Sequence, residues 1–329
     1  MSLLGYSLSP ATCARCGKAI KLFDKVQFNK ATKRCSTCEA EVREALANFR
    51  QAFLTSSADG MMTAAEWDQL VEMVQRDGVE LEEALGSVRG EAIQLLERTL
   101  AIAAADGMLT DGEERDFLQL QGLLQVPSDM ILPQIEWMRY LRHITQIRRG
   151  ELPTYETSVR LASDEICHLE VAATYQRVTH DQIMADAGRL LASSRRLYFF
   201  SPNGDIEVAY AAISRVEQRS GGVYLQLDQR LGSGFYGLED SKFVAAIIET
   251  LARRAGGLRD QQAQADQGHI PREVKIAVWK RDQGRCAECG SQSYLEFHHI
   301  IPPAKGGASS APNVQLICQT CYSTRGALD

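Results

Sequence analysis

The amino-acid sequence predicts a multidomain protein of the α+β class. Its 329 residues exceed the length that a single hydrophobic core usually organises. Eight of the nine cysteines fall into four Cys-x-x-Cys pairs, two near each end of the chain. Between these ends, apolar residues recur first with a helical period and then at every second position. We therefore expect, in chain order, a cysteine-bound module at 1–40, a helical domain at 41–150, a β domain at 155–256, a linker at 257–268 and a second cysteine-bound module at 269–329.

The cysteine pairs indicate metal binding. Nine cysteines placed at random would give roughly a quarter of one Cys-x-x-Cys pair, so four pairs are not chance. In a reducing compartment this spacing is typical of metal thiolates rather than disulfides. We predict one structural Zn²⁺ site of four thiolates at each end, and we expect Cys167, the remaining cysteine, to be a buried, inert thiol. The predicted ligands are Cys13, Cys16, Cys35 and Cys38 at the first site and Cys286, Cys289, Cys318 and Cys321 at the second.

Targeting signals and charge narrow the class of protein. The first residues lack the charged and apolar regions of a signal peptide, and no run approaches the ~18 consecutive apolar residues of a spanning helix. We therefore expect a cytoplasmic protein. The net charge is −6, but the acid is concentrated in residues 39–150, which carry ten Lys or Arg against twenty Asp or Glu. Residues 1–38 carry seven against one and residues 268–329 seven against five, so both cysteine-bearing ends are basic.

The first module is too short to fold on apolar burial alone, so the metal has to supply folding energy. A strand-like stretch, Lys25–Phe28, and a turn at Asn29 separate its two cysteine pairs. With its Cys-x-x-Cys-Gly-Lys opening, the module resembles small bacterial zinc ribbons. Two roles stay open. One is a folded knob or adaptor, and the other is a direct contact with nucleic acid. The candidate contacts are Arg15, Lys18, Lys21, Lys25 and Lys30.

The helical domain contains an internal repeat, in which residues 58–66 recur as residues 105–113. Each copy turns at Asp-Gly and restarts with Thr-x-x-Glu, the sequence of a helix capping box. This pattern resembles the TerB-like helical domain of bacterial tellurite-resistance and stress or defence operons. The resemblance implies that acidic residues at these turns bind divalent cations, while the alternative is that they only cap helices. The matching positions are Asp59, Glu66, Asp106 and Glu113.

The β domain is predicted from its period of two and its turns. Residues 188–201 are expected to form a strand pair, and Asn203-Gly204 a hairpin turn with positive φ at both positions. Further strands are expected at 206–210, 213–218 and 223–227, followed by an amphipathic helix at 240–255. Successive strands followed by one helix resemble the PH-like or GRAM-like barrel. No Lys or Arg cluster indicates a phosphoinositide ligand, so we expect a protein-docking or spacer role.

The second module carries the most specific pattern. A basic helix leads into Cys286-x-x-Cys289, and then come His298-His299-Ile-Ile-Pro, a Lys-Gly-Gly turn, Asn313 and the last cysteine pair. Over residues 270–326 the sequence closely resembles the HNH endonucleases of the four-cysteine type, which have a ββα-metal fold. The resemblance implies DNA as the substrate. The expected DNA contacts are Arg272, Lys275, Lys280, Arg281, Lys305 and Arg325.

The resemblance also assigns catalytic roles. His299 is the general base that activates a water molecule, for which a free imidazole with a pKa near ~6.5 is suited. His298 binds a divalent cation, magnesium or manganese, and Asn313 orients the loop and holds the base. The family usually has His or Asn directly after the last cysteine, where this chain has Tyr322. A neutral phenol is a poor magnesium ligand. Glu296, on the same strand face as His298, is expected to supply an oxygen instead.

Three functions are consistent with these patterns. The leading one is a metal-dependent HNH DNA endonuclease of bacterial defence or stress response, with partner proteins docking on the TerB-like and PH-like domains. The second is a catalytically inert, zinc-dependent DNA-binding adaptor in which Tyr322 marks a lost active site. The third is a membrane-surface scaffold recruited through the PH-like barrel. A plasmid-nicking assay separates the first two, and binding to liposomes identifies the third.

Overall fold

The fold is taken from a computed structural model of the chain. The structure describes residues 12–20, 28–104, 107–179, 182–219, 221–228, 231–258, 270–291, 295–301, 306–318 and 320–322. They fall into two compact units: Met1–Leu96 with Leu120–Met130, and Glu97–Gln119 with Ile131–Asp329. Among the described residues, no helix is long and apolar enough to cross a membrane.

The N-terminal module is a pair of short loops with little apolar core. Isolated bridges join Thr12 to Ala19 and Asn29 to Arg34, and the Asn29 side chain accepts a hydrogen bond from the Ala31 N–H (3.0 Å). The turn at Asn29 is therefore confirmed, whereas the strand-like residues 25–27 and Lys21 lie outside the described residues. The guanidinium of Arg15, a candidate nucleic-acid contact, donates to the carbonyl of Asp77 (2.8 Å), which favours a structural role for this side chain.

Helices occupy most of the described residues between 36 and 149, where the sequence predicts a helical domain at 41–150. Both capping boxes are present: the Glu66 N–H donates to Thr63 Oγ1, and the Glu113 N–H donates to Thr110 Oγ1, each at 3.2 Å. Each glutamate carboxylate accepts in return from its threonine N–H, so these carboxylates cap helices. The TerB-like assignment stays a prediction. The helices are α1 (Ser36–Ser56), α2 (Ala64–Arg76), α3 (Leu81–Ser87), α4 (Arg89–Ala103), α5 (Asp111–Leu123) and α6 (Leu132–Arg149).

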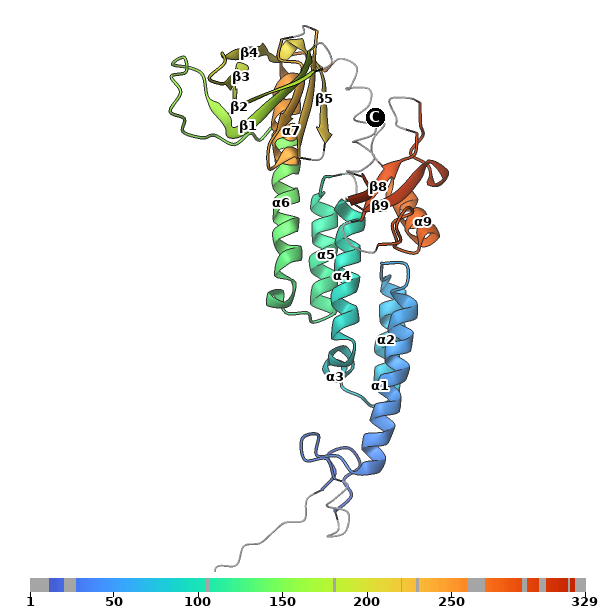
Figure 1. Cartoon of the computed structure of the whole chain (residues 1–329). Coiled ribbons are helices and arrows are strands. Elements are labelled where there is room, and N and C mark those ends of the chain that lie inside the picture. Colours follow the sequence, from blue (N-terminus) through green and yellow to red (C-terminus); the bar gives the residue numbers. More distant parts are fainter. Residues whose placement is uncertain are drawn as a thin grey trace, which may run out of the picture. The chain divides into compact units, whose positions relative to one another are not determined.

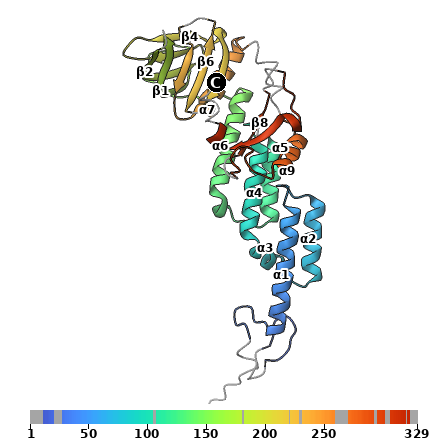
Figure 2. The ribbon, with the colours of Figure 1, turned by 45° about the vertical axis from the view of Figure 1, so that its right-hand side comes forward.

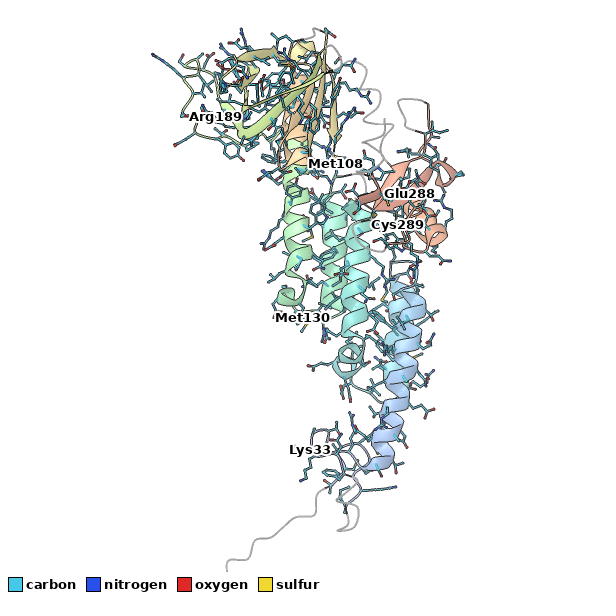
Figure 3. The ribbon with its side chains drawn as sticks, viewed as in Figure 1. Lys33, Met108, Met130, Arg189, Glu288 and Cys289 are labelled. Carbon is cyan, nitrogen blue, oxygen red and sulfur yellow. The ribbon has the colours of Figure 1, made fainter. Side chains whose placement is uncertain are left out.

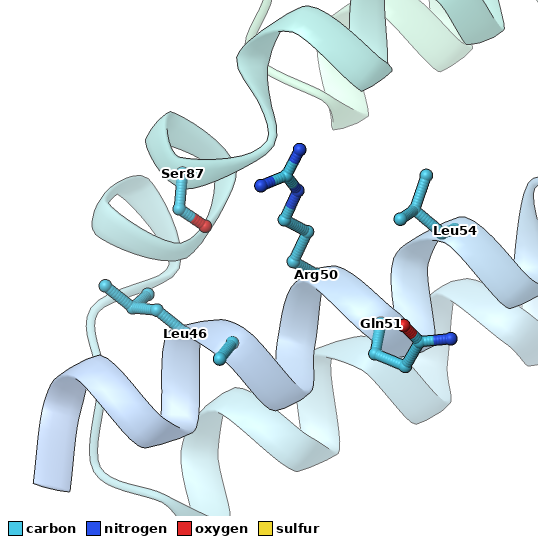
Figure 4. A pocket seen from close by; sticks show the side chains of 6 residues that line it. Leu46, Arg50, Gln51, Leu54 and Ser87 are labelled. Atoms are coloured by element: carbon cyan, nitrogen blue, oxygen red, sulfur yellow. The ribbon is translucent and has the colours of Figure 1, made fainter.

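In the first unit, α1 and α3 border a shallow hollow (Figure 4). Arg50 of α1 lines it and forms an ion pair with Glu91 (2.5 Å). The other lining residues are Leu46, Ala47, Gln51, Leu54 and Ser87. None of them is a candidate site residue.

The β domain is a seven-stranded antiparallel sheet with the order β4-β3-β2-β1-β7-β6-β5. Its last element, α7 (Ser241–Arg254), is capped by Asp240, whose side chain accepts from the Phe243 N–H, and packs on the sheet near β5 (Figure 1). Sheet and helix bury one continuous apolar core. The PH-like assignment remains a prediction. The strands are β1 (Cys167–Thr179), β2 (Gln182–Ser193), β3 (Arg196–Phe200), β4 (Ile206–Ala209), β5 (Ile213–Arg219), β6 (Gly222–Leu227) and β7 (Gly234–Gly237).

One detail of the predicted hairpin is wrong. β3 and β4 pair as expected, with Phe199 opposite Ile206. However, only Gly204 has a positive φ (125°), and Asn203 does not. The Gly204 N–H donates to the Ser201 carbonyl (3.1 Å), so Pro202 and Asn203 are the central residues of the turn. Because proline has its φ fixed near −65°, it is incompatible with a turn that needs positive φ there.

The C-terminal module is small and mixed. Helix α9 (Arg272–Asp282) precedes the antiparallel strands β8 (Leu295–His299) and β9 (Val314–Cys318), and residues 320–322 begin a further helical turn. β8 lies beside α9 (Figure 2), where Trp279 and Phe297 are in contact with ring centroids 6.4 Å apart. The fully buried residues Val314 and Leu316 of β9 complete this core, which fixes the strand that carries both histidines.

Candidate active site and metal centres

The C-terminal cysteine cluster has the geometry of a closed zinc site. Cys286, Cys289, Cys318 and Cys321 place their four Sγ atoms within 4.8 Å of one another, and Cys289 Sγ is 3.6 Å from Cys318 Sγ. Two ligands of a tetrahedral Zn²⁺ with Zn–S bonds of about 2.3 Å are roughly 3.8 Å apart. The residues therefore fit a structural Zn²⁺. Cys289 and its neighbour Glu288 lie in a turn of the C-terminal module (Figure 3).

The N-terminal cluster repeats this arrangement. The Sγ atoms of Cys13, Cys16, Cys35 and Cys38 also lie within 4.8 Å of one another, and those of Cys16 and Cys35 are 3.9 Å apart. Among the described residues, these two cysteine clusters are the only groups of three or more His, Cys, Asp or Glu side chains whose ligand atoms lie close enough together to hold a metal ion. The acidic turn residues of the helical domain form no such group there, and Asp106 lies outside the described residues.

Backbone amides activate one thiol in each cluster. The N–H groups of Cys16 and Cys35 lower the pKa of Cys13 to about 6. Burial by itself would raise the pKa of Cys286, but the N–H groups of Cys289 and Cys318 bring it down to about 6. The thiolate form of Cys13 and of Cys286 is thereby favoured at neutral pH, and the thiolate is the form that binds zinc.

Strand β8 separates the predicted base from the predicted metal ligands. Successive side chains of a strand point to opposite faces, so Glu296 and His298 share one face and His299 belongs to the other. The pairing of His299 with Val314 of β9 fixes this register. Leu295 and Phe297, on the face of His299, are buried and anchor the strand. The alternation predicted for the two histidines is therefore present.

The side chains of Glu296 and His298 place two potential metal-ligand atoms close together. Glu296 Oε2 is 3.3 Å from His298 Nε2, and this hydrogen bond lowers the pKa of Glu296. Two ligands that bind one Mg²⁺ at right angles, each at about 2.1 Å, lie roughly 3 Å apart. The carboxylate oxygen and the ring nitrogen therefore fit a shared divalent cation.

Tyr322 stacks on His298. The two rings are 4.0 Å apart between centroids and 17° from parallel. Burial, followed by the nearby Glu296 carboxylate, raises the pKa of Tyr322, so the phenol stays neutral. A stacked ring covers the face of the imidazole, while the nitrogen lone pairs lie in the plane of that ring. Tyr322 therefore orients His298 without competing for its donor atoms.

His299 is held by a residue that the sequence motif does not include. Its Nε2 lies 2.9 Å from Ser309 Oγ, on the loop between the two strands. Burial, followed by the charge of His298, lowers the pKa of His299. The neutral ring, which is the form that can accept a proton, is thereby favoured at neutral pH.

Asn313 holds the loop rather than the imidazole. Its Oδ1 accepts from the Ile301 N–H (2.9 Å), and its Nδ2 donates to the carbonyls of Ile301 (3.0 Å) and Ala308 (2.9 Å). In the part of the chain that is described, no hydrogen bond joins Asn313 to His299. The predicted role of Asn313 in orienting the loop therefore has a geometric basis, and its hold on the base is indirect.

The Gly-Gly turn is required by space and by backbone conformation. Gly306 has φ +84°, and nothing lies within 4 Å of the position that a Cβ would take. A Cβ on Gly307 would lie 1.9 Å from the Ile301 carbonyl oxygen and 2.7 Å from Asn313 Nδ2. Only glycine at 307 allows the loop to close on Asn313.

Gly307→Ala is therefore expected to lower the stability of the C-terminal module by about 3 kcal/mol, because a backbone carbonyl cannot move aside cheaply. Gly306→Asn is the matched control, since the space there is open and asparagine tolerates a positive φ. Thermal unfolding of the full chain, followed by limited proteolysis at the C-terminal module, measures the difference. Equal melting of the two variants would contradict the argument.

The structure assigns different environments to the predicted DNA contacts. Lys280 is exposed. Lys275 is only 2% exposed, and its Nζ lies 3.4 Å from the Ala103 carbonyl oxygen, so it does not suit a phosphate contact. The side chain of Arg272, Lys305 and Arg325 lie outside the described residues.

Arg281 and Asp282 connect α9 to β9. Arg281 donates to the carbonyls of Ala311 (2.5 Å) and Val314 (2.8 Å), and Asp282 Oδ2 accepts from the Leu316 N–H (3.0 Å). The two side chains also bond to each other. Arg281 therefore has a structural role beside its predicted DNA contact, and Asp282 is a structural residue that the sequence did not indicate.

Comparisons with known proteins agree with this geometry. Residues 286–327 match the family described as HNH endonuclease. The chain is similar to the type IV methyl-directed restriction enzyme EcoKMcrA of Escherichia coli (strain K12), with 28% identity over 87 residues. The match covers 23% of this chain and 31% of that relative, so it spans less than a third of the relative's length. The C-terminal module is an HNH endonuclease domain.

Proposed function

We propose that this HNH domain hydrolyses DNA phosphodiesters, with His299 as the general base and a divalent cation held by Glu296 and His298. The observation that supports this proposal most is that β8 carries the candidate metal ligands on one face and the candidate base on the other. One face carries the converging carboxylate and imidazole, 3.3 Å apart, and the other carries a partly buried imidazole whose lowered pKa favours the neutral form. The zinc-binding cysteines contribute none of these groups and serve the fold.

The proposed chemistry divides among residues of this chain. His299 accepts a proton from the attacking water at a ring nitrogen. Glu296 and His298 would hold the cation, and a cation bound there would stabilise the charge on the phosphoryl oxygens. Tyr322 stacks on the His298 ring and restricts its rotation. Asn313 and Gly307 keep the loop closed against the end of β8.

The substrate and the biological role are also proposals. The relative named above is a methyl-directed restriction enzyme, and on that basis we propose that this chain acts on DNA in bacterial defence. The match covers only 31% of the relative, and we propose that the remaining domains of this chain serve in sensing or in docking of partners. Methylated and unmethylated copies of one plasmid are the appropriate pair of substrates.

Conversion of supercoiled plasmid to open-circular or linear DNA tests the proposal directly. The full chain is incubated with magnesium or manganese, and a reaction with a chelator that removes both is the control. We expect cleavage that depends on the cation. Tight DNA binding without cleavage in either metal would contradict the nuclease and identify the DNA-binding adaptor.

Tyr322 is the observation that favours the adaptor, because the family usually has a ligand at this position. If the stacking seen here serves the cation site, Tyr322→Phe should keep the parent's magnesium requirement, since the ring remains. Tyr322→Ala should raise the magnesium concentration for half-maximal nicking by about tenfold, in line with the loss of an orienting partner. Tyr322→His tests whether an added ligand lowers that concentration. An unchanged magnesium requirement in Tyr322→Ala would show that the stacking is not needed.

A further inference from the structure

The loop that joins β8 to β9 brings one hydroxyl to the candidate base. Ser309 Oγ lies 2.9 Å from His299 Nε2, although the two residues are on different segments of the module. Both side chains are partly buried. The neighbouring residue, Ser310, instead uses its backbone: its N–H donates to the Ala308 carbonyl and its carbonyl accepts from the Asn313 N–H, each at 2.9 Å. Two adjacent serines therefore have different roles.

The position of Ser309 is set by the scaffold around it. Asn313 Nδ2 donates to the carbonyl of Ala308 (2.9 Å), the residue directly before Ser309. Ile300 directly follows His299 in the chain, and its N–H donates to the Asn313 carbonyl (2.7 Å). Asn313 thus holds the backbone next to Ser309 with its side chain and the backbone next to His299 with its own carbonyl group. These hydrogen bonds to the backbone hold the Ser309 hydroxyl beside the His299 imidazole.

The chemistry of a neutral imidazole makes this contact consequential. One ring nitrogen carries the proton and the other has the lone pair, and only the second can accept a proton from water. A hydroxyl that accepts from Nε2–H favours the tautomer with the lone pair on Nδ1. It also restricts rotation of the ring about the Cβ–Cγ bond. Orientation and tautomer are the two properties that a general base needs from its partner.

We propose that Ser309 is a positioning residue for His299, which accepts the Nε2–H hydrogen bond and leaves Nδ1 as the proton-accepting atom. The proposal rests on the function of His299 as the base. Asn313 acts one step further away, because it positions Ser309. The Asn313 side chain holds the Ala308 carbonyl, the adjacent Ser309 contacts His299, and this indirect route replaces the direct contact between Asn313 and the base that the sequence motif suggests.

Plasmid nicking by the full chain tests the kinetic part. Ser309→Ala is expected to lower kcat by about 10- to 100-fold, the usual loss for a misplaced catalytic group, with little change in KM. Ser309→Thr keeps the hydroxyl and should recover most of the rate. Ser310→Ala is the matched control and should nick at the parent rate. Zinc content is measured for every variant to show that the module is folded.

A spectroscopic measurement keeps the proposal separate from the nuclease function. Nitrogen NMR of the full chain with ¹⁵N-labelled histidine reports which nitrogen of His299 carries the proton. The parent and Ser309→Thr should show the Nε2–H tautomer, and Ser309→Ala should show a shift toward a mixture. If Ser309→Ala nicks at the parent rate while His299→Ala is inactive, the positioning role is wrong and the nuclease stands. If the parent does not nick, the nuclease fails, and an unchanged tautomer in Ser309→Ala overturns the positioning role as well.

Discussion

His299→Ala is expected to lower the rate of plasmid nicking by ~10²-fold or more, the usual scale for removal of a general base. His299 is partly buried on the face of β8 that does not carry Glu296 and His298. Its loss should therefore leave the cation site, the zinc content and the affinity for DNA unchanged. DNA binding by gel shift and metal analysis are measured on the same preparation as the nicking rate.

The matched control is His143→Ala, which removes an exposed imidazole from α6. This variant should nick at the parent rate. A loss of nicking that is seen only in His299→Ala then does not result from handling of the protein. Parent-level nicking by His299→Ala would mean that another residue is the base or that a contaminating nuclease cuts the plasmid. The gel-shift result then shows whether DNA binding remains as the function of the domain.

The sequence predicted the parts of the site that depend on spacing. Four Cys-x-x-Cys pairs placed two ligand clusters correctly, because a pair of thiols two residues apart can reach one ion wherever it folds. Likewise, the period of two along β8 placed Glu296 beside His298 and separated both from His299. Both deductions need only local geometry.

The missed features depend on contacts between segments. Ser309 and Asp282 belong to residue types that are common in loops and at helix ends, and nothing near them in the sequence marks their partners at His299 and Leu316. Lys275 appeared to belong to a basic helix face, but it is almost fully buried. Helical periodicity gives the faces of α9 without showing which of them packs. The motif alone therefore placed a buried lysine among the predicted DNA contacts and did not indicate Ser309 and Asp282.

Two strands were also missed for physical reasons. β7 (Gly234–Gly237) has glycine at both ends and resembles a turn in sequence. The glycine at its start is a packing requirement, since a Cβ on Gly234 would lie 2.4 Å from the carbonyl oxygen of Gln176 in β1. β1 itself does not alternate cleanly, because the three residues Cys167, His168 and Leu169 at its start are all buried. Period-two patterns detect strands with one solvent-facing side, and this strand begins without one.

Cys286→Ser and Cys318→Ser are expected to unfold the C-terminal module outright. Both thiols are buried, and the described part of the module offers two strands of five residues and a helix of 11 residues as the main elements of a core. Structural zinc contributes on the order of 10 kcal/mol to domains of this size, more than such a core supplies. The parent should contain two Zn²⁺ per chain after gel filtration, and each variant should contain one and lose nicking.

Cys167→Ser is the matched control: its thiol is also buried, but it donates to the Leu169 carbonyl (3.4 Å), so the variant should keep two Zn²⁺. If the parent contains one Zn²⁺ per chain, one of the two predicted sites does not bind zinc. The zinc content of Cys286→Ser then shows which site is occupied. Loss of the remaining ion in this variant identifies the C-terminal cluster as the occupied one.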